Sequence, residues 1–269
     1  MRRSRLVLFL SALLLTAATA LTGAATAHAS QLAANSGYVA LGDSYSSGVG
    51  AGSYISSSGD CKRSTKAYPY LWAAANSPAS FHFTACSGAR TGDVLNGQLG
   101  PLSSTTGLVS ISIGGNDAGF ADVMTTCVLQ SDSTCLSRIA TARSYVDSTL
   151  PGLLDNVYSA IRGKAPNARV VVLGYPRFYR LGTTCLGLSE TKRKAINDGA
   201  DHLNNTIAQR AGAHGFTFGD VRTTFTGHEL CSGDSWLHSV NWLNIGESYH
   251  PKAAGQSGGY LPLLSGAAA

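Results

Sequence analysis

Short apolar runs alternate along the chain with longer segments in which apolar residues recur at helical spacing. Five runs are predicted strands: 38–41, 81–85, 108–113, 169–173 and a weaker one at 216–219. Helical spacing predicts helices at 68–75, 138–161 and 189–211, and a last short helix that opens at His250-Pro251. Pro151 is expected to start a new helix inside the second of these segments, or to kink it.

Strands that alternate with helices are typical of βαβ units and a parallel sheet. The chain shows no internal repeat and no linker long enough to divide it, so we predict one α/β domain. Ligands of such sheets bind outside the carboxyl ends of the strands. The loops of interest therefore follow five residues: Leu41, Ala85, Ile113, Leu173 and Gly219.

The amino terminus has the pattern of a secretory signal. Three arginines within the first five residues precede an apolar run at 6–21, and Ala27-His28-Ala29 fits the small-x-small cleavage rule. We predict a signal at 1–29, an enzyme domain at 30–269 and a secreted product; a cut after Ala34 is a second possibility. The alternative is a membrane anchor, but the run is short for a span. We therefore expect no stable membrane insertion.

Composition narrows the class of protein. Hydrophobic residues make up 44% of the chain, which excludes a disordered, highly charged protein. Without residues 1–29 the chain has 17 basic and 15 acidic residues, a net charge of +2, and we expect no nucleic-acid partner. The one basic run, Lys192-Arg193-Lys194, is expected on a solvated helix face. A monomer is expected.

Six cysteines in an exported chain indicate disulfides. Fifteen pairings of six cysteines are possible. We prefer the nearest-neighbour pairing, in which each bond clamps one long connection: Cys61–Cys86, Cys127–Cys135 and Cys185–Cys231. The chain has no Cys/His zinc spacing and no Gly-rich phosphate loop, so neither a metal nor a cofactor is expected.

Residues suited to acyl transfer follow three of the strands and recur near the carboxyl terminus. They are Gly42-Asp43-Ser44-Tyr45-Ser46, Cys86-Ser87-Gly88-Ala89, Gly114-Gly115-Asn116-Asp117 and Tyr249-His250-Pro251. A serine needs a base to take its proton, and histidine suits that task. The oxyanion of the intermediate needs fixed donors, which the Ser44 and Gly88 N–H groups and the Asn116 amide can supply. Asp43 is expected to hold its loop, without a chemical role.

These blocks, in this order, resemble those of the GDSL/SGNH hydrolase family over residues 38–252. Size, signal and cysteines resemble its secreted actinomycete lipases and phospholipases. The resemblance implies a flavodoxin-like α/β/α sandwich with a five-stranded parallel sheet, carboxylic-ester hydrolysis and three disulfides paired in sequential order. It implies Ser44 as nucleophile, His250 as base, and an oxyanion hole of Ser44, Gly88 and Asn116. It also implies an acyl-ester substrate, expected to be a lipid.

One position departs from the family pattern. Where the family has Asp three residues before the histidine, this chain has Glu247. Glutamate can orient an imidazole. Some secreted relatives resemble a dyad, in which a backbone carbonyl takes that part, and here the carbonyl of Ser248 is the candidate. We favour the carbonyl, and both candidates stay open.

Alternatives remain for the substrate and for the class. Phe120, Met124, Val128 and Leu129 either line an acyl groove or support the core. A phospholipase A or a carbohydrate acetyl esterase would use the same machinery. A non-catalytic module would instead stack sugars on Trp72, Trp236 and Trp242. Residues 255–259 fit the G-x-S-x-G elbow, but no acid or histidine follows Ser257, so we predict a flexible turn there.

Overall fold

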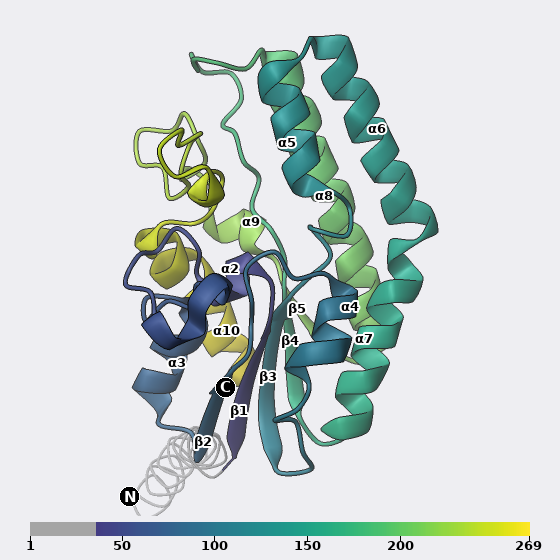
Figure 1. Ribbon diagram of the computed structural model, residues 1–269, viewed down its shortest axis with the longest axis vertical. Helices are drawn as coiled ribbons and strands as arrows, with labels where there is room; N and C mark the ends of the chain where they lie inside the picture. The colour runs from purple at the N-terminus through teal and green to yellow at the C-terminus, as the bar shows by residue number, and fades with distance from the viewer. Residues whose placement is uncertain (1–35) are drawn as a thin grey trace, which may run out of the picture.

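The computed structural model describes residues 36–269 and centres on a five-stranded parallel sheet (Figure 1). Its spatial order is β2-β1-β3-β4-β5. The strands are β1 (Gly37–Gly42), β2 (Ser80–Phe83), β3 (Thr106–Ser112), β4 (Arg169–Leu173) and β5 (Thr217–Gly219). The predicted parallel sheet is confirmed, and the central strands are buried, as apolar runs without alternation indicate.

Helices cover both faces of the sheet, which makes the α/β/α sandwich that was predicted (Figure 1). One layer contains α3 (Tyr68–Asn76) and α10 (Leu261–Ala268), which pack on each other. The other contains α4 (Thr91–Asp93), α7 (Leu150–Lys164) and α8 (Glu190–Ala213). Beyond the carboxyl edge of the sheet, α5 (Phe120–Leu129) and α6 (Asp132–Ser148) stand beside the first half of α8. The short elements are α2 (Ser44–Ser47), η1 (Ser56–Cys61), η2 (Val94–Gln98), α9 (Val221–Thr224), η3 (Ile245–Glu247) and η4 (Gly255–Tyr260).

The structure confirms one predicted helix boundary and corrects another. The segment 138–161 forms two helices, and Pro151 lies in the first turn of α7, where its missing N–H costs nothing. The carboxyl-terminal helical segment begins at Ala253 rather than at Pro251. Pro251 instead pairs with Leu237 in an antiparallel bridge, which keeps the chain extended as far as that residue.

The expected flexible turn at 255–259 is wrong, because this segment is helical and largely buried. Gly258 and Gly259 pack so closely on Trp236 and Phe225 that a Cβ atom at either position would overlap a ring. Gln256 accepts a hydrogen bond from the Tyr68 N–H and donates one to the Tyr45 carbonyl. Its side chain therefore joins the carboxyl-terminal helix to α2 and α3.

The expected solvated face at 192–194 is also wrong for two of its three residues. Lys192 and Arg193 are buried. Lys192 donates to the Gln130 carbonyl at the end of α5, and Arg193 donates to the carbonyls of Arg180 and Thr183. Each cation therefore provides hydrogen-bond donors to backbone carbonyls at loop ends. Lys194 alone is solvated, where it pairs with Asp198 one turn away.

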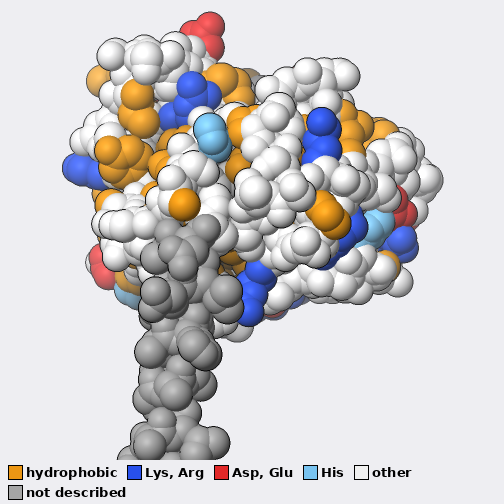
Figure 2. All heavy atoms as spheres, turned by 90° about the horizontal axis from the view of Figure 1, so that it is seen from below, with side chains coloured by type: hydrophobic (Ala, Val, Ile, Leu, Met, Phe, Trp, Pro, Cys, Tyr) orange, Lys and Arg blue, Asp and Glu red, His pale blue; other side chains and the backbone are white. Residues whose placement is uncertain are grey.

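The described residues pair the six cysteines as Cys61–Cys86, Cys127–Cys135 and Cys185–Cys231. The second bond joins α5 to α6. The predicted signal and both cleavage positions lie outside the described residues. No helix within residues 36–269 has the length and apolar character needed to cross a bilayer. Figure 2 shows the end of the molecule opposite the carboxyl edge, where basic and apolar side chains are scattered.

Candidate active site

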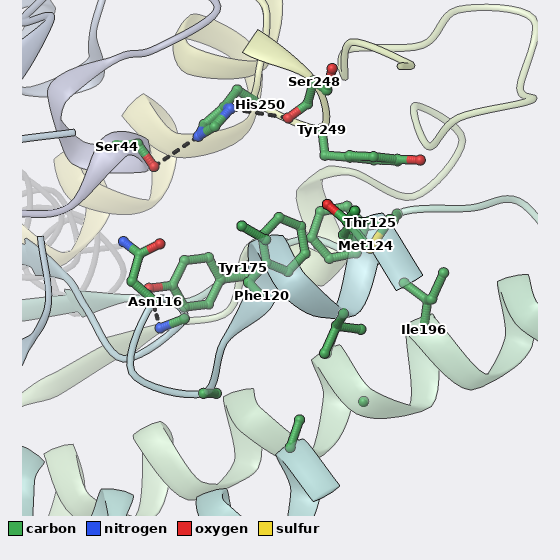
Figure 3. A pocket seen from close by; sticks show the side chains of 18 of the residues that line it. Ser44, Asn116, Phe120, Met124, Thr125, Tyr175, Ile196, Ser248, Tyr249 and His250 are labelled. Atoms are coloured by element: carbon green, nitrogen blue, oxygen red, sulfur yellow. Dashed lines mark hydrogen bonds between the residues drawn. The ribbon is translucent and has the colours of Figure 1, made fainter. Parts of the chain in front are cut away.

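Ser44 lies directly after β1, in the first turn of α2. The strand ends at Gly42, and Asp43 caps the short helix by accepting a hydrogen bond from the Tyr45 N–H at 3.0 Å. Ser44 Oγ lies 2.8 Å from Nε2 of His250, although 206 residues separate the two in the chain (Figure 3). The parallel sheet brings the loop after β1 to the edge where the carboxyl-terminal segment returns.

His250 is oriented by the backbone two residues before it. Its Nδ1 lies 3.1 Å from the Ser248 carbonyl oxygen (Figure 3). A carbonyl can only accept, so Nδ1 carries the proton and Nε2 is left to accept the hydrogen of Ser44. The Glu247 carboxylate is engaged elsewhere, because it accepts a hydrogen bond from the Tyr54 hydroxyl at 2.7 Å. The structure therefore brings the Ser248 carbonyl, and not the Glu247 side chain, to the imidazole.

The segment that carries His250 is held on both sides. His238 donates its N–H to the His250 carbonyl, and its own carbonyl accepts from the Tyr249 N–H. Tyr249 has a φ of +66°, a left-handed conformation that is uncommon outside glycine. The Tyr45 hydroxyl holds that residue by donating to its carbonyl at 2.9 Å. This turn between residues 248 and 250 points the Ser248 carbonyl at the imidazole.

Burial sets the protonation state of the imidazole. Desolvation by the surrounding side chains lowers the pKa of His250 to about 4. The hydrogen bond to the Ser248 carbonyl opposes this shift and is the smaller effect. At neutral pH the ring is therefore uncharged, which is the form that can take a proton from serine.

Two further loops bring donors to the same space. The Asn116 side-chain amide donates one hydrogen to the Ala89 carbonyl at 2.9 Å, which fixes the group, and its second N–H has no hydrogen-bond partner among the described residues. Gly88 has a φ of +77°, and a Cβ added there would meet no atom within 4 Å. Its backbone is therefore open to the cavity. Asp117 ties this region to α4 by accepting hydrogen bonds from Thr91.

Asp43 lies beneath the serine and joins two of these loops. Its carboxylate accepts hydrogen bonds from Ser112 Oγ at 2.7 Å and from the Tyr175 hydroxyl. Tyr175 in turn accepts from the Gly115 N–H, which precedes Asn116. Burial raises the pKa of Asp43 to about 6, against the lowering effect of these hydrogen bonds. This network, which the sequence did not reveal, fixes the distance between the serine loop and the amide loop.

An apolar cavity of about 480 Å³ extends from these groups between three helices (Figure 3). One face of α6 and one face of α8 line it, each through four residues at the helical spacing i, i+3, i+4, i+7. Those of α6 are Ile139, Ala142, Arg143 and Val146, and those of α8 are Ile196, Gly199, Ala200 and Leu203. The four predicted residues of α5 (Phe120, Met124, Val128 and Leu129) line it too. The small residues of the α8 face were missed, although their helical spacing was visible in the sequence.

The tryptophans that a sugar-binding module would need are mostly unavailable. Trp72 is buried against Tyr38, with ring centroids 5.0 Å apart. Trp236 is covered by a stacked His228 ring at 3.5 Å. Trp242 alone is exposed, and it lines the cavity. The stacking surface of the non-catalytic hypothesis is therefore not formed.

Comparison with known proteins identifies the family. The model of the GDSL-like lipase/acylhydrolase family matches residues 40–257. The chain belongs to the GDSL-like lipase/acylhydrolase family. It is a carboxylic ester hydrolase of that family, since relatives at high identity are named as lipases. Lipase 1 of Streptomyces coelicolor is 83% identical over 268 residues, all of both chains.

Two solved structures from Streptomyces resemble the GDSL-like fold found here. The crystal structure of phospholipase A1 from Streptomyces albidoflavus NA297 has 69% identity and a TM-score of 0.86, over 87% of this chain and 99% of that one. The extracellular lipase of Streptomyces rimosus has 67% identity and a TM-score of 0.84, over 86% and 99%. Both relatives are named as enzymes that hydrolyse lipid esters.

Proposed function

We propose that this chain hydrolyses acyl esters of lipids with Ser44 as nucleophile and His250 as base. His250 takes the proton of Ser44 as Oγ bonds to the ester carbonyl carbon. The resulting oxyanion lies among the N–H groups of Ser44 and Gly88 and the amide of Asn116. Collapse of the intermediate breaks the ester bond, and the leaving alcohol takes the proton from His250.

Deacylation repeats the same proton movements with water. His250 takes a proton from the water that attacks the acyl-serine, and the second intermediate uses the same donors. Its collapse returns the proton to Ser44 and releases the carboxylic acid. The 2.8 Å contact between Ser44 Oγ and His250 Nε2 supports this sequence, as does the Nδ1 bond to the Ser248 carbonyl, which leaves Nε2 as the acceptor. The Ser248 carbonyl orients the ring, so we propose a dyad rather than a triad with Glu247.

The observation that carries the lipid assignment is the apolar cavity. It begins at the serine, and the side chains of α5, α6 and α8 that line it are aliphatic or aromatic apart from Thr125 and Arg143. An acetyl group would leave nearly all of this apolar surface in contact with water, whereas a long acyl chain would cover it. Each buried methylene contributes about 0.8 kcal/mol. The cavity therefore favours a lipid ester over an acetylated carbohydrate.

A series of nitrophenyl esters from acetate to dodecanoate tests this proposal. We expect kcat/KM to rise with chain length to C8 or beyond. Preference for acetate would overturn the lipid assignment.

Ser44→Ala should abolish hydrolysis and labelling by a fluorophosphonate while leaving the melting temperature close to that of the parent. Asn116→Ala should lower kcat by about 10²–10³-fold, as for the loss of one oxyanion donor.

The lipid class needs a separate measurement. The phospholipase A1 relative, at 69% identity, supports a phospholipid substrate for this chain, whereas the relatives named lipases support a neutral glyceride. We propose that the chain accepts a phospholipid, as the phospholipase A1 relative supports, with the acyl chain in the cavity and the headgroup outside it. Release of fatty acid from phosphatidylcholine and from trioctanoylglycerol, measured side by side, distinguishes the two. Activity on the glyceride alone would contradict the phospholipid assignment.

We also infer that the chain is exported and acts as a monomer. The three disulfides support an oxidising compartment, and the extracellular lipase of Streptomyces rimosus is a relative. The amino terminus of protein recovered from culture medium should be Ser30, or Asn35 if the second site is used. An intact Met1 in the medium would refute the signal.

A further inference from the structure

Exposed apolar side chains surround the mouth of the cavity. Leu129, Trp242 and Ile245 line the cavity, yet they are 60%, 70% and 61% exposed. Leu243, between the last two, does not line the cavity and is fully exposed. These four residues are called the apolar rim below. Exposed apolar side chains grouped in this way mark interaction sites.

The rim is presented by a turn with its own hydrogen bonds. Asn241 accepts from the N–H groups of Leu243 and Asn244 through its side-chain oxygen. The Asn241 N–H donates to Ser248 Oγ at 2.9 Å, next to the catalytic segment. The turn therefore holds Trp242 and Leu243 outward and is fastened at its base. In Figure 1 this yellow-green loop stands at the upper left, to the left of α5, at the end of the molecule away from the face shown in Figure 2.

We infer that the apolar rim seats the enzyme on the surface of a phospholipid bilayer, from which the acyl chain passes directly into the cavity. This inference rests on the proposed function. The rim continues into the cavity through three shared residues, so a lipid chain could move between them without crossing water. Tryptophan favours the interface between lipid and water, where its ring is buried and its N–H stays solvated.

The charge beside the loop that carries Trp242, Leu243 and Ile245 fits an anionic lipid surface. The segment 239–246 contains no charged residue, and the carboxylate of Glu247, which follows it, accepts a hydrogen bond from the Tyr54 hydroxyl. The ammonium of Lys62 lies beside it, 3.6 Å from where a Cβ atom on Gly246 would stand. A cation next to an uncharged apolar tip is attracted to lipid phosphates. A protein partner seated on the rim would instead cover the mouth of the cavity that leads to Ser44, which argues against that occupant.

Leu243 allows the inference to be tested apart from catalysis, because it lies outside the cavity. Protein with Ser44→Ala is mixed with vesicles of phosphatidylcholine and phosphatidylglycerol, and the bound fraction is measured by sedimentation. Adding Leu243→Ser should weaken binding about tenfold, as expected when one exposed leucine no longer enters the lipid. Leu243→Trp should restore it. The matched control is Leu95→Ser, which changes a 37% exposed leucine away from the cavity and should leave binding unchanged.

Activity separates this inference from the proposed function. With Ser44 present, Leu243→Ser should leave hydrolysis of soluble nitrophenyl butyrate unchanged and lower hydrolysis of vesicle lipid about tenfold. If the parent protein hydrolysed neither substrate, the proposed function would be refuted. Intact hydrolysis together with vesicle binding that does not respond to Leu243 would overturn the docking surface. A Leu243-dependent dimer in size-exclusion chromatography without vesicle binding would also overturn it, since the apolar rim would then be an interface with a second copy of the chain.

Discussion

Gly199 should set the length of acyl chain that the cavity accepts. It lies inside α8 without a positive φ, so no backbone conformation requires glycine there. Glycine within a helix costs roughly 1 kcal/mol relative to alanine. The cavity explains why glycine occupies this position, because residue 199 lines the cavity opposite α6. A Cβ atom would stand 3.7 Å from Cγ2 of Ile139, an ordinary contact, and larger side chains would extend into the cavity.

The substitution Gly199→Leu puts four side-chain carbons into this space. We expect them to displace about three methylenes of a long acyl chain, which at about 0.8 kcal/mol each amounts to about 2.4 kcal/mol. That free energy corresponds to roughly a 60-fold loss in kcat/KM. Chains too short to reach α8 should lose nothing. Gly199→Ala should keep long-chain activity and raise stability by up to about 1 kcal/mol.

The assay is the ratio of kcat/KM for nitrophenyl dodecanoate to that for nitrophenyl butyrate, measured below the critical micelle concentration. Gly199→Leu should lower this ratio sharply, and Gly199→Ala should leave it nearly unchanged. Thermal unfolding of both variants shows whether they fold like the parent. An unchanged ratio in a folded Gly199→Leu protein would show that the acyl chain does not lie against α8.

Three further predictions concern the histidine and its supports. Glu247→Gln should keep most of the activity, because the amide oxygen can still accept from Tyr54 and the Ser248 carbonyl still orients His250; a loss of several thousand-fold in kcat would refute the dyad. The acid limb of the kcat/KM profile should fall near pH 4, since desolvation lowers the pKa of His250 to about 4 and keeps the base neutral above it. A limb near pH 6.5 on folded protein would contradict this. Tyr45→Phe should cost about 1–3 kcal/mol of unfolding free energy by leaving the buried Tyr249 carbonyl without its donor. It should lower kcat more than it changes KM, and unchanged kcat would show that this bond does not position His250.

The strands and the order of the site blocks could be predicted because they depend on local pattern. The short, valine-rich apolar run at 169–173 indicates a strand buried on both faces, and the same residues form β4. Segments whose environment depends on packing with distant residues were harder to predict. Lys192 and Arg193 look like a solvated run, but they are buried against carbonyls of loops that the sequence cannot place. Residues 255–259 look like a turn until Phe225 and Trp236 pack against their glycines.

The same distinction divides the site. Ser44, Gly88, Asn116 and His250 could be proposed from the sequence, because each occupies a block with a chemical reason for its residue type. The residues that hold these four in place carry no such signal in the sequence. Tyr45 reaches Tyr249 across 204 residues, and Tyr175 reaches Asp43 across 132. In one sequence a buried tyrosine that holds a loop resembles any core tyrosine. These hydroxyls nonetheless determine whether the serine, the imidazole and the amide meet. A substitution that preserves all four proposed residues can therefore still disable the site, if it removes a hydroxyl that fixes the distance between two loops.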